Sequence, residues 1–167
     1  DFAILLAWGV LAGGIFFNPG FPWARDATHH LWGLWGYFMA VKNGSLYPLW
    51  VPWIGLGSPL LLFYPPLNFL LALPFYPFGL SPVAALKAVF ILNHILCGLT
   101  MYLLVMDLTR SRSSSLVAGV LYVLAPYRML DINYRAAMGE ANAFIFLPLV
   151  FLFSIRRFLM QFLTNLD

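Results

Sequence analysis

Long apolar runs, interrupted by short polar turns, dominate this chain and predict helices that cross a membrane. The runs cover about residues 2–17, 82–108, 113–129 and 142–156. A hydrocarbon core of roughly 30 Å needs about 20 helical residues, so the shorter runs need their flanking residues to span it. We therefore predict an all-α, multipass transmembrane bundle of four spans. Residues 1–167 would form a single membrane domain, which we expect to be a fragment of a longer chain.

The segment between the first two spans, residues 18–81, predicts its own helix. Asp26 is a good N-cap residue, and Asn43-Gly44 is a typical helix stop, so the helix should cover Ala27–Lys42. Apolar residues recur along it with helical spacing, and Trp and Tyr flank them. This pattern is typical of a helix lying at a membrane interface.

Hydropathy alone would make Leu60–Leu80 a fifth span, but its prolines argue against a crossing. Four prolines interrupt it, and each removes a backbone donor and disrupts a helix. The longest proline-free run, Leu67–Leu73, reaches only about 10 Å as a helix. We predict a second short juxtamembrane helix after Pro65-Pro66. Loops 18–81 and 130–141 then lie on the same face of the membrane.

Basic residues suggest which face this is. The turn TRSRSSS (109–115) and Arg156-Arg157 share one face in either topology, and the positive-inside rule assigns that face to the cytoplasm. Basic residues in the other loops are interleaved with acids, which indicates a site rather than a topology signal. We predict a protein of the cell membrane with both termini cytoplasmic and both site loops extracytoplasmic.

Composition supports a membrane protein and excludes several other classes. Hydrophobic residues make up 62% of the chain and charged residues 9%, with a mean hydropathy of +0.86, too little charge to cover a soluble domain. The net charge of +3 is small and its basic residues are scattered, so nucleic acid is not an expected partner. Cys97 is the single cysteine, which excludes a disulfide framework. Membrane lipid is the expected surrounding, and the oligomeric state stays open.

Asp26, His29 and His30 form the first candidate site. A carboxylate with histidines three and four residues later shares one helix face, an arrangement suited to acid–base chemistry or to a divalent metal held by Asp26 and His30. The alternative is structural: Asp26 caps the helix and the histidines are interfacial polar residues.

Arg128, Asp131, Arg135 and Glu140 form the second candidate site. Arginine binds phosphate oxygens bidentately, so the cluster predicts a pocket for an anionic, lipid-linked group. The alternative is a ladder of Arg128, Asp131 and Arg135 at i,i+3 and i,i+4 spacing on one helix face.

Two further polar pairs stand in apolar surroundings. In LFYPPLNF (62–69), Tyr64 and Asn68 would face the loop cavity, unless the segment is only an aromatic interfacial anchor. Asn93 and His94 lie at mid-depth in the second span and should hydrogen-bond to neighbouring helices. If they instead line a pathway, the protein would be a transporter.

The order of these motifs resembles a known arrangement. An Asp after the first span is followed by YP.W.P (47–52), Gly55-x-Gly57-x-Pro59, a YPPL helix start and PYR..D...R...GE (126–140). Over most of its length the chain resembles bacterial multipass proteins of the membrane 6-pyruvoyl-tetrahydropterin synthase-related family. More broadly it resembles the N-terminal module of membrane glycosyltransferases with the GT-C fold.

This resemblance implies transfer of a sugar from a polyprenyl-phosphate donor on the extracytoplasmic side. Asp26 would be the base or a metal ligand, and a divalent metal is left open as the cofactor. Some relatives carry a Lys before the Pro-Pro, where Tyr64 stands here, so Lys87, Arg128 or Arg135 would have to meet the donor phosphate. The alternative function is a non-catalytic membrane protein that binds or moves a lipid-linked polymer.

Overall fold

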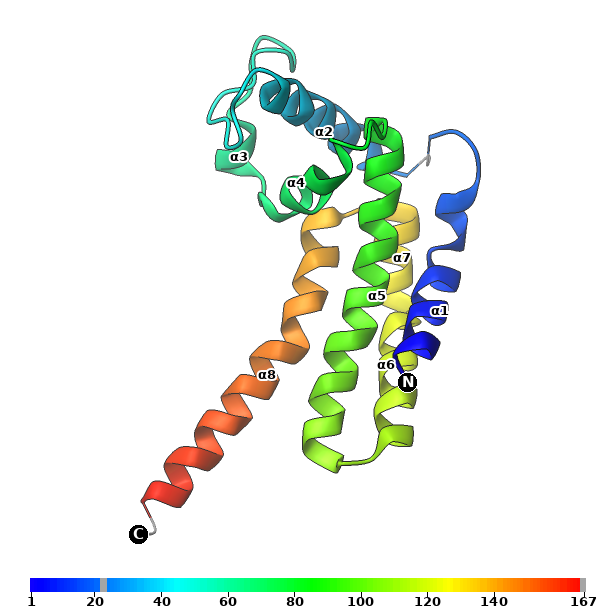
Figure 1. Cartoon of the computed structure of the whole chain (residues 1–167), viewed down its shortest axis with the longest axis vertical. Helices are drawn as coiled ribbons and strands as arrows, with labels where there is room; N and C mark the ends of the chain where they lie inside the picture. Colours follow the sequence, from blue (N-terminus) through cyan, green and yellow to red (C-terminus); the bar gives the residue numbers. More distant parts are fainter. Residues whose placement is uncertain (22–23, 166–167) are drawn as a thin grey trace.

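A computed structural model describes residues 1–21 and 24–165 of the chain. It is 74% helical, and its described residues form no strand, which confirms the predicted all-α class. Helices α1, α5, α6 and α8 run along one long direction, and α2, α3 and α4 gather at one end (Figure 1). We call the segment that holds these three helices, residues 24–81, the cap.

Helix α5 (Pro82–Thr109) lies at the centre and contacts α1 (Phe2–Ala12), α6 (Arg112–Val123) and α8 (Met138–Thr164). Helices α5 and α6 pack closely because each carries a glycine at the contact. A Cβ on Gly119 would lie 2.9 Å from the carbonyl oxygen of Gly98. Such small-residue contacts are typical of helices that associate in membranes.

Two of the described helices, α5 and α8, are long and apolar enough to cross a membrane, which indicates a membrane protein. A third candidate is a bent pair, Arg112–Val123 with Pro126–Arg135, whose halves differ by 42°. The bend falls at Leu124-Ala125, where Pro126 begins α7 (Pro126–Leu130) and cannot continue the hydrogen bonding of α6. A π-helical turn, Asp131–Arg135, follows.

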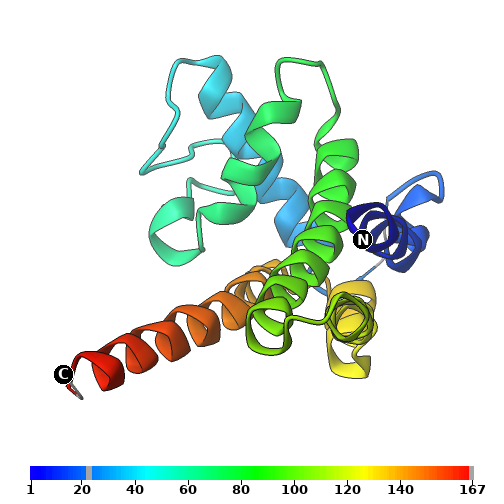
Figure 2. The ribbon, with the colours of Figure 1, turned by 60° about the horizontal axis from the view of Figure 1, so that its bottom comes forward.

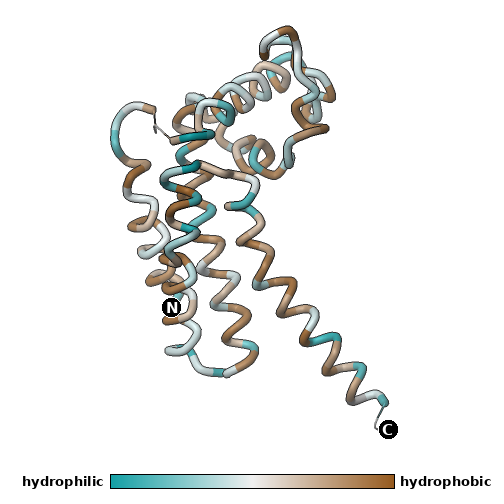
Figure 3. Tube along the Cα trace, turned by 180° about the vertical axis from the view of Figure 1, so that it is seen from behind, coloured by the Kyte–Doolittle hydropathy of each residue, from teal (hydrophilic) through white to brown (hydrophobic). Residues whose placement is uncertain are grey.

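Two helices differ in their ends from the predicted spans. Helix α1 has 11 residues, about 17 Å, and gives way at Gly13 to a 3-10 turn over Gly14–Phe17. Helix α8 begins at Met138 and runs past Arg156-Arg157, where the prediction ended it. In its second half α8 leaves the bundle (Figures 1 and 2), and only 17% of its most apolar window is buried. Apolar residues continue along that half (Figure 3), as expected for contact with lipid.

The cap contains α2 (Ala27–Lys42), α3 (Leu60–Phe63) and α4 (Leu67–Ala72). The predicted bounds of α2 are confirmed, as is a short helix after Pro65-Pro66; α3 was not predicted. Asp26 occupies the N-cap position of α2, but its side chain makes no capping hydrogen bond. The predicted N-capping interaction was therefore wrong.

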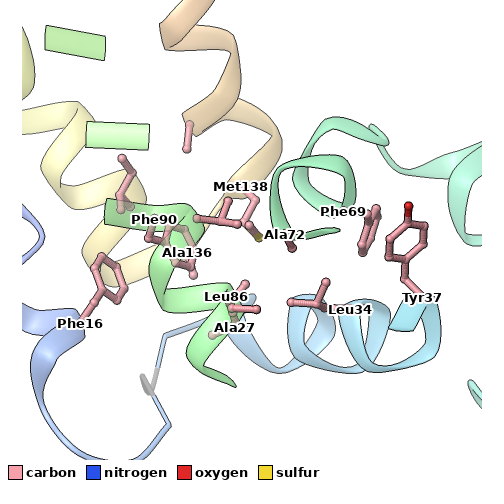
Figure 4. Packing of buried hydrophobic residues seen from close by; sticks show 14 of the residues in the cluster. Phe16, Ala27, Leu34, Tyr37, Phe69, Ala72, Leu86, Phe90, Ala136 and Met138 are labelled. Carbon is pink, nitrogen blue, oxygen red and sulfur yellow. The ribbon is translucent and has the colours of Figure 1, made fainter. Parts of the chain in front are cut away.

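One apolar cluster fixes the cap to the bundle. Leu34 and Phe69 from the cap belong to one buried cluster with Leu86 at the start of α5 (Figure 4). Deeper in the same cluster, Phe16 stacks on Phe90 of α5 with ring centroids 4.8 Å apart. The continuous cluster holds the cap at the N-terminal ends of α5 and α8, where the candidate site lies.

Candidate functional site

The two polar loops of the sequence meet at the cap end of the bundle. The amide nitrogen of Asp26 donates to the carbonyl oxygen of Arg135 at 2.9 Å, and that of Arg25 donates to Tyr134 at 3.1 Å. These backbone bonds join the entry to α2 with the π-helical turn. They bring the first candidate site beside the second, although more than 100 residues separate them in the sequence.

Arg135 is the centre of an ion-pair cluster. Its Nη1 lies 2.7 Å from Asp131 Oδ1, and its Nη2 lies 3.0 Å from Glu140 Oε1. Tyr127 donates its hydroxyl proton to Glu140 Oε2 at 2.9 Å. The left-handed backbone of Ala136 (φ 54°) ends the π-turn and reverses the chain, which brings Glu140 back towards Arg135.

The inner and outer partners of Arg135 differ in exposure. The Asp131 side chain is fully buried and its Oδ2 has no hydrogen-bond partner among the described residues. Glu140 is exposed, and the Arg135 side chain is 31% exposed. A ligand that approaches from outside therefore meets Arg135 and Glu140 first.

Arg128 does not join this cluster, so the predicted three-residue ladder was wrong at one end. Arg128 is 1% exposed and points into the bundle, where its guanidinium donates to Val123 O and Asn93 Oδ1, both at 2.9 Å. Its Nη1 also lies 2.8 Å from His94 Nδ1. Buried against α5, Arg128 cannot meet a phosphate in the loops in this arrangement.

The same interior network reaches the cap. Asn93 donates to Asn142 Oδ1 at 3.1 Å, and Asn142 in turn donates to Asn68 Oδ1 on α4. Asn93 and His94 thus bond to neighbouring helices, as predicted. Asn68 is buried in this network and does not face the loop cavity, which corrects its predicted place. The reason is that α4 turns this residue towards α8.

His30, which is buried, and Tyr64, which is half-buried, form a pair between the two loops. His30 Nε2 lies 3.3 Å from the Tyr64 hydroxyl, which also accepts a hydrogen bond from the Gly139 amide at 3.3 Å. Burial lowers the pKa of His30 from 6.5 to about 4, an effect that the nearby Asp26 carboxylate only partly offsets. Burial also raises the pKa of Tyr64. Both groups are neutral near pH 7.

The Asp26 carboxylate is half-buried and lies within electrostatic reach of His30, Tyr64 and Asp131. The described part of the chain gives it neither a side-chain hydrogen bond nor an ion pair. Its neighbour His29 is exposed. No group of three or more His, Cys, Asp or Glu side chains among the described residues is placed to hold a metal ion, so a metal at Asp26 and His30 would need further ligands.

Lys87 lies apart from the Arg135 cluster. Its Nζ donates to the carbonyl oxygen of Asn18 at 2.7 Å, beside a pocket of about 240 Å³ that Asn133 also lines. The ammonium group therefore ties the start of the first loop to α5.

A larger pocket, of about 580 Å³, lies within the cap on the outer side of His30 and Tyr64. Its described lining comes from α2, from the turn that follows Val51 and from α3 and α4. The lining residues are His29, His30, Trp32, Gly33, Trp53, Ile54, Gly55, Ser58, Leu60, Tyr64 and Phe69.

Sequence reasoning missed four residues of these arrangements. Tyr127 and Asn142 bond to residues that it singled out, and Trp32 and Trp53 line the pocket. The sequence does point to Asn142, because a side-chain amide at the start of an apolar helix needs a hydrogen-bond partner. The tryptophans gave none beyond the general enrichment of aromatic residues at interfaces.

Comparison of the chain with protein-family models, with curated proteins and with solved structures finds no match.

Proposed function

We propose that this chain is the N-terminal module of a GT-C-like membrane glycosyltransferase, with four spans and with the cap and the 130–141 loop extracytoplasmic. It would transfer a sugar from a polyprenyl-phosphate donor to a glycan or lipid acceptor. The support is twofold: the order of sequence motifs resembles that module, and the described geometry gathers an acid, a cation and a pocket at one end of the bundle.

One observation carries the proposal: the backbone bonds that join Arg25-Asp26 to Tyr134-Arg135. They place the backbone of Asp26, whose carboxylate has no ion-pair partner among the described residues, beside the backbone of Arg135, whose guanidinium is partly exposed. A carboxylate without a cationic partner can accept a proton, and a partly exposed guanidinium can bind an anion when an exposed carboxylate partner moves away.

In the proposed reaction, an acceptor hydroxyl oxygen forms a bond to the anomeric carbon of the donor sugar. The bond between that carbon and the phosphate oxygen breaks, and its electron pair leaves with the polyprenyl phosphate. Asp26 accepts the hydroxyl proton, and Arg135 meets the charge that develops on the phosphate.

Arg135 already carries two carboxylates, so phosphate binding requires an exchange. Asp131 is buried and stays in place, whereas Glu140 is exposed and can turn away into water. In the proposed complex the phosphate replaces Glu140 on Arg135. Exposed ion pairs are worth about 1 kcal/mol or less, so the exchange costs little.

Asp26→Asn tests the catalytic role. Membranes of cells that make the full-length protein would receive radiolabelled polyprenyl-phospho-glucose, -mannose or -galactose, and release of polyprenyl phosphate would be measured. We expect release to fall at least about 100-fold in Asp26→Asn, the range for loss of a general base. Binding of a short synthetic polyprenyl phosphate, measured by native mass spectrometry, should be unchanged.

Asp107→Asn is the matched control. Asp107 lies at the far end of α5, where it pairs with Arg156 at 2.6 Å, and its neutralisation should leave release unchanged. No release above background from either Asp26→Asn or wild type, with intact lipid binding in both, would favour the alternative of a non-catalytic binder of lipid-linked polymers.

The proposed topology has its own test. Single cysteines would replace Ser45, Phe78, Ser113 and Tyr134, all exposed, in a Cys97→Ser background; Cys97 itself is buried. Impermeant thiol reagents should label positions 45, 78 and 134 from outside the cell and position 113 only from inside. Labels at 45 and 134 from opposite sides would refute a shared compartment.

A further inference from the structure

The pocket of the cap differs chemically from the ion-pair cluster beside it. None of its described lining residues is an Asp, Glu, Lys or Arg. Its volume of about 580 Å³ lies within the range of small-molecule sites, roughly 300–1,000 Å³. A pocket without charge disfavours phosphate, carboxylate and metal ligands, because each would lose its hydration without gaining an opposite charge.

Two tryptophans give the pocket flat, accessible apolar walls. Trp32 on α2 is 54% exposed and Trp53 in the following turn is 37% exposed. An indole ring has an electron-rich face, which attracts weakly polarised C–H groups laid against it. The C–H face of a sugar ring is such a surface.

Polar groups also line the pocket. His29, Ser58 and the His30–Tyr64 pair contribute imidazole and hydroxyl groups. The Tyr64 hydroxyl accepts a hydrogen bond from Gly139 and lies 3.3 Å from His30 Nε2, where the histidine tautomer decides which group donates. Several hydrogen-bond donors and acceptors beside aromatic walls match a ligand that is apolar on its faces and rich in hydroxyls at its edges.

A glycine on α2 allows close packing at one wall of the pocket. Gly33 lies on the α2 side of the pocket, and a Cβ there would come within 3.3 Å of the Phe69 ring and 3.4 Å of Leu60 Cδ1. The contact between α2 and α4 is therefore already tight, and a larger side chain would move this wall.

From these features we infer that the cap pocket binds a neutral sugar ring, stacked on Trp53 with its hydroxyls towards His29 and Tyr64. Binding itself does not depend on the proposed function. The assignment of this sugar as part of the acceptor rests on that function, because Asp26 lies one helical turn before His29 and His30.

Saturation-transfer NMR on the full-length protein in nanodiscs, free of sugar detergents, tests the inference. The probes are the methyl glycosides of glucose, galactose, mannose and N-acetylglucosamine, with cyclohexanol and inorganic phosphate as comparison ligands. We expect saturable binding of at least one glycoside, weakened about tenfold or more in Trp53→Ala by loss of the stacking surface.

Trp8→Ala is the matched control. Trp8 lies on α1, outside the described lining of the pocket, and is 39% exposed, close to the value for Trp53. The Trp8→Ala variant should bind glycosides as the wild type does. A Trp53→Phe variant, which keeps a smaller ring, should retain part of the affinity.

Three results would overturn the inference: no saturable binding of any glycoside, equal loss in Trp8→Ala and Trp53→Ala, or equal binding of cyclohexanol or phosphate. Glycoside binding with no release of polyprenyl phosphate from labelled donors would leave this inference standing and would refute the proposed transferase. Release of polyprenyl phosphate without glycoside binding would refute this inference and leave the proposed transferase standing.

Discussion

Arg128 and Arg135 lie seven residues apart, yet they occupy opposite environments. Arg128 is buried in the bundle and donates to neutral acceptors, Val123 O, Asn93 and His94. Arg135 lies at the edge of the cap between one buried and one exposed carboxylate. Residue type alone therefore does not identify an anion site: the first arginine is enclosed by the bundle, and the second has one carboxylate partner that is exposed to solvent.

The bend at Pro126 precedes both arginines, whereas the change from the α-helical turn Pro126–Leu130 to the π-helical turn Asp131–Arg135 falls between them. In a regular α-helix over 126–135, Arg128, Asp131 and Arg135 would share one face. The 42° break turns Arg128 back towards the end of α6, where it bonds to a carbonyl that has no helical partner. The π-helical turn then carries Asp131 and Arg135 outward to the cap.

Removal of Arg128 should have the largest effect on stability. In Arg128→Met, the side chains of Asn93 and His94 and the Val123 carbonyl lose their donor in a buried site. We expect a loss of about 3 kcal/mol or more in the free energy of unfolding, because each buried group left unpaired costs about 1–3 kcal/mol. Unfolding by SDS titration from mixed micelles would measure it. A change as small as that of Glu140→Gln would contradict the structural role of Arg128.

The sequence predicted elements whose ends are marked by local residues. Asp26 and Asn43-Gly44 gave the bounds of α2, and Pro65-Pro66 gave the start of a short helix. Arg156-Arg157 misled because long basic side chains do not end a helix. Arg156 instead pairs with Asp107 of α5 at 2.6 Å, so α8 continues past it.

The candidate site was predicted less well because its contacts are tertiary. Spacing identified the Arg135–Asp131 pair, which is local. It could not place Arg128, whose acceptors Asn93 and His94 lie 35 and 34 residues earlier, on another helix. The place of Asn68 was predicted wrongly for the same reason, since its hydrogen-bond partner Asn142 lies 74 residues away.

His30 extends the comparison to a group that titrates. Unfolded, it binds a proton below pH 6.5; folded, its pKa is about 4. The unfolded state thus binds more protons between these values, so stability falls as pH falls through this window. At about pH 5 we expect roughly 2 kcal/mol less stability from His30 than at neutral pH.

His30→Gln should remove this part of the pH dependence, measured as the difference in unfolding free energy between neutral pH and pH 5. His29→Gln, on the exposed neighbour, is the control and should keep the wild-type profile. A wild-type profile in His30→Gln would show that His30 is not held neutral by its burial.

Glu140→Gln should have the smallest effect on stability and the clearest effect on binding. Glu140 is exposed, so loss of its charge should change the unfolding free energy by about 1 kcal/mol or less. The substitution leaves Arg135 with Asp131 alone and removes a competitor for the anion. We expect a short synthetic polyprenyl phosphate to bind several-fold more tightly, as measured by native mass spectrometry. Unchanged or weaker binding would mean that the phosphate does not exchange with Glu140, and Arg135 would then belong with Arg128 among the arginines that only stabilise the fold.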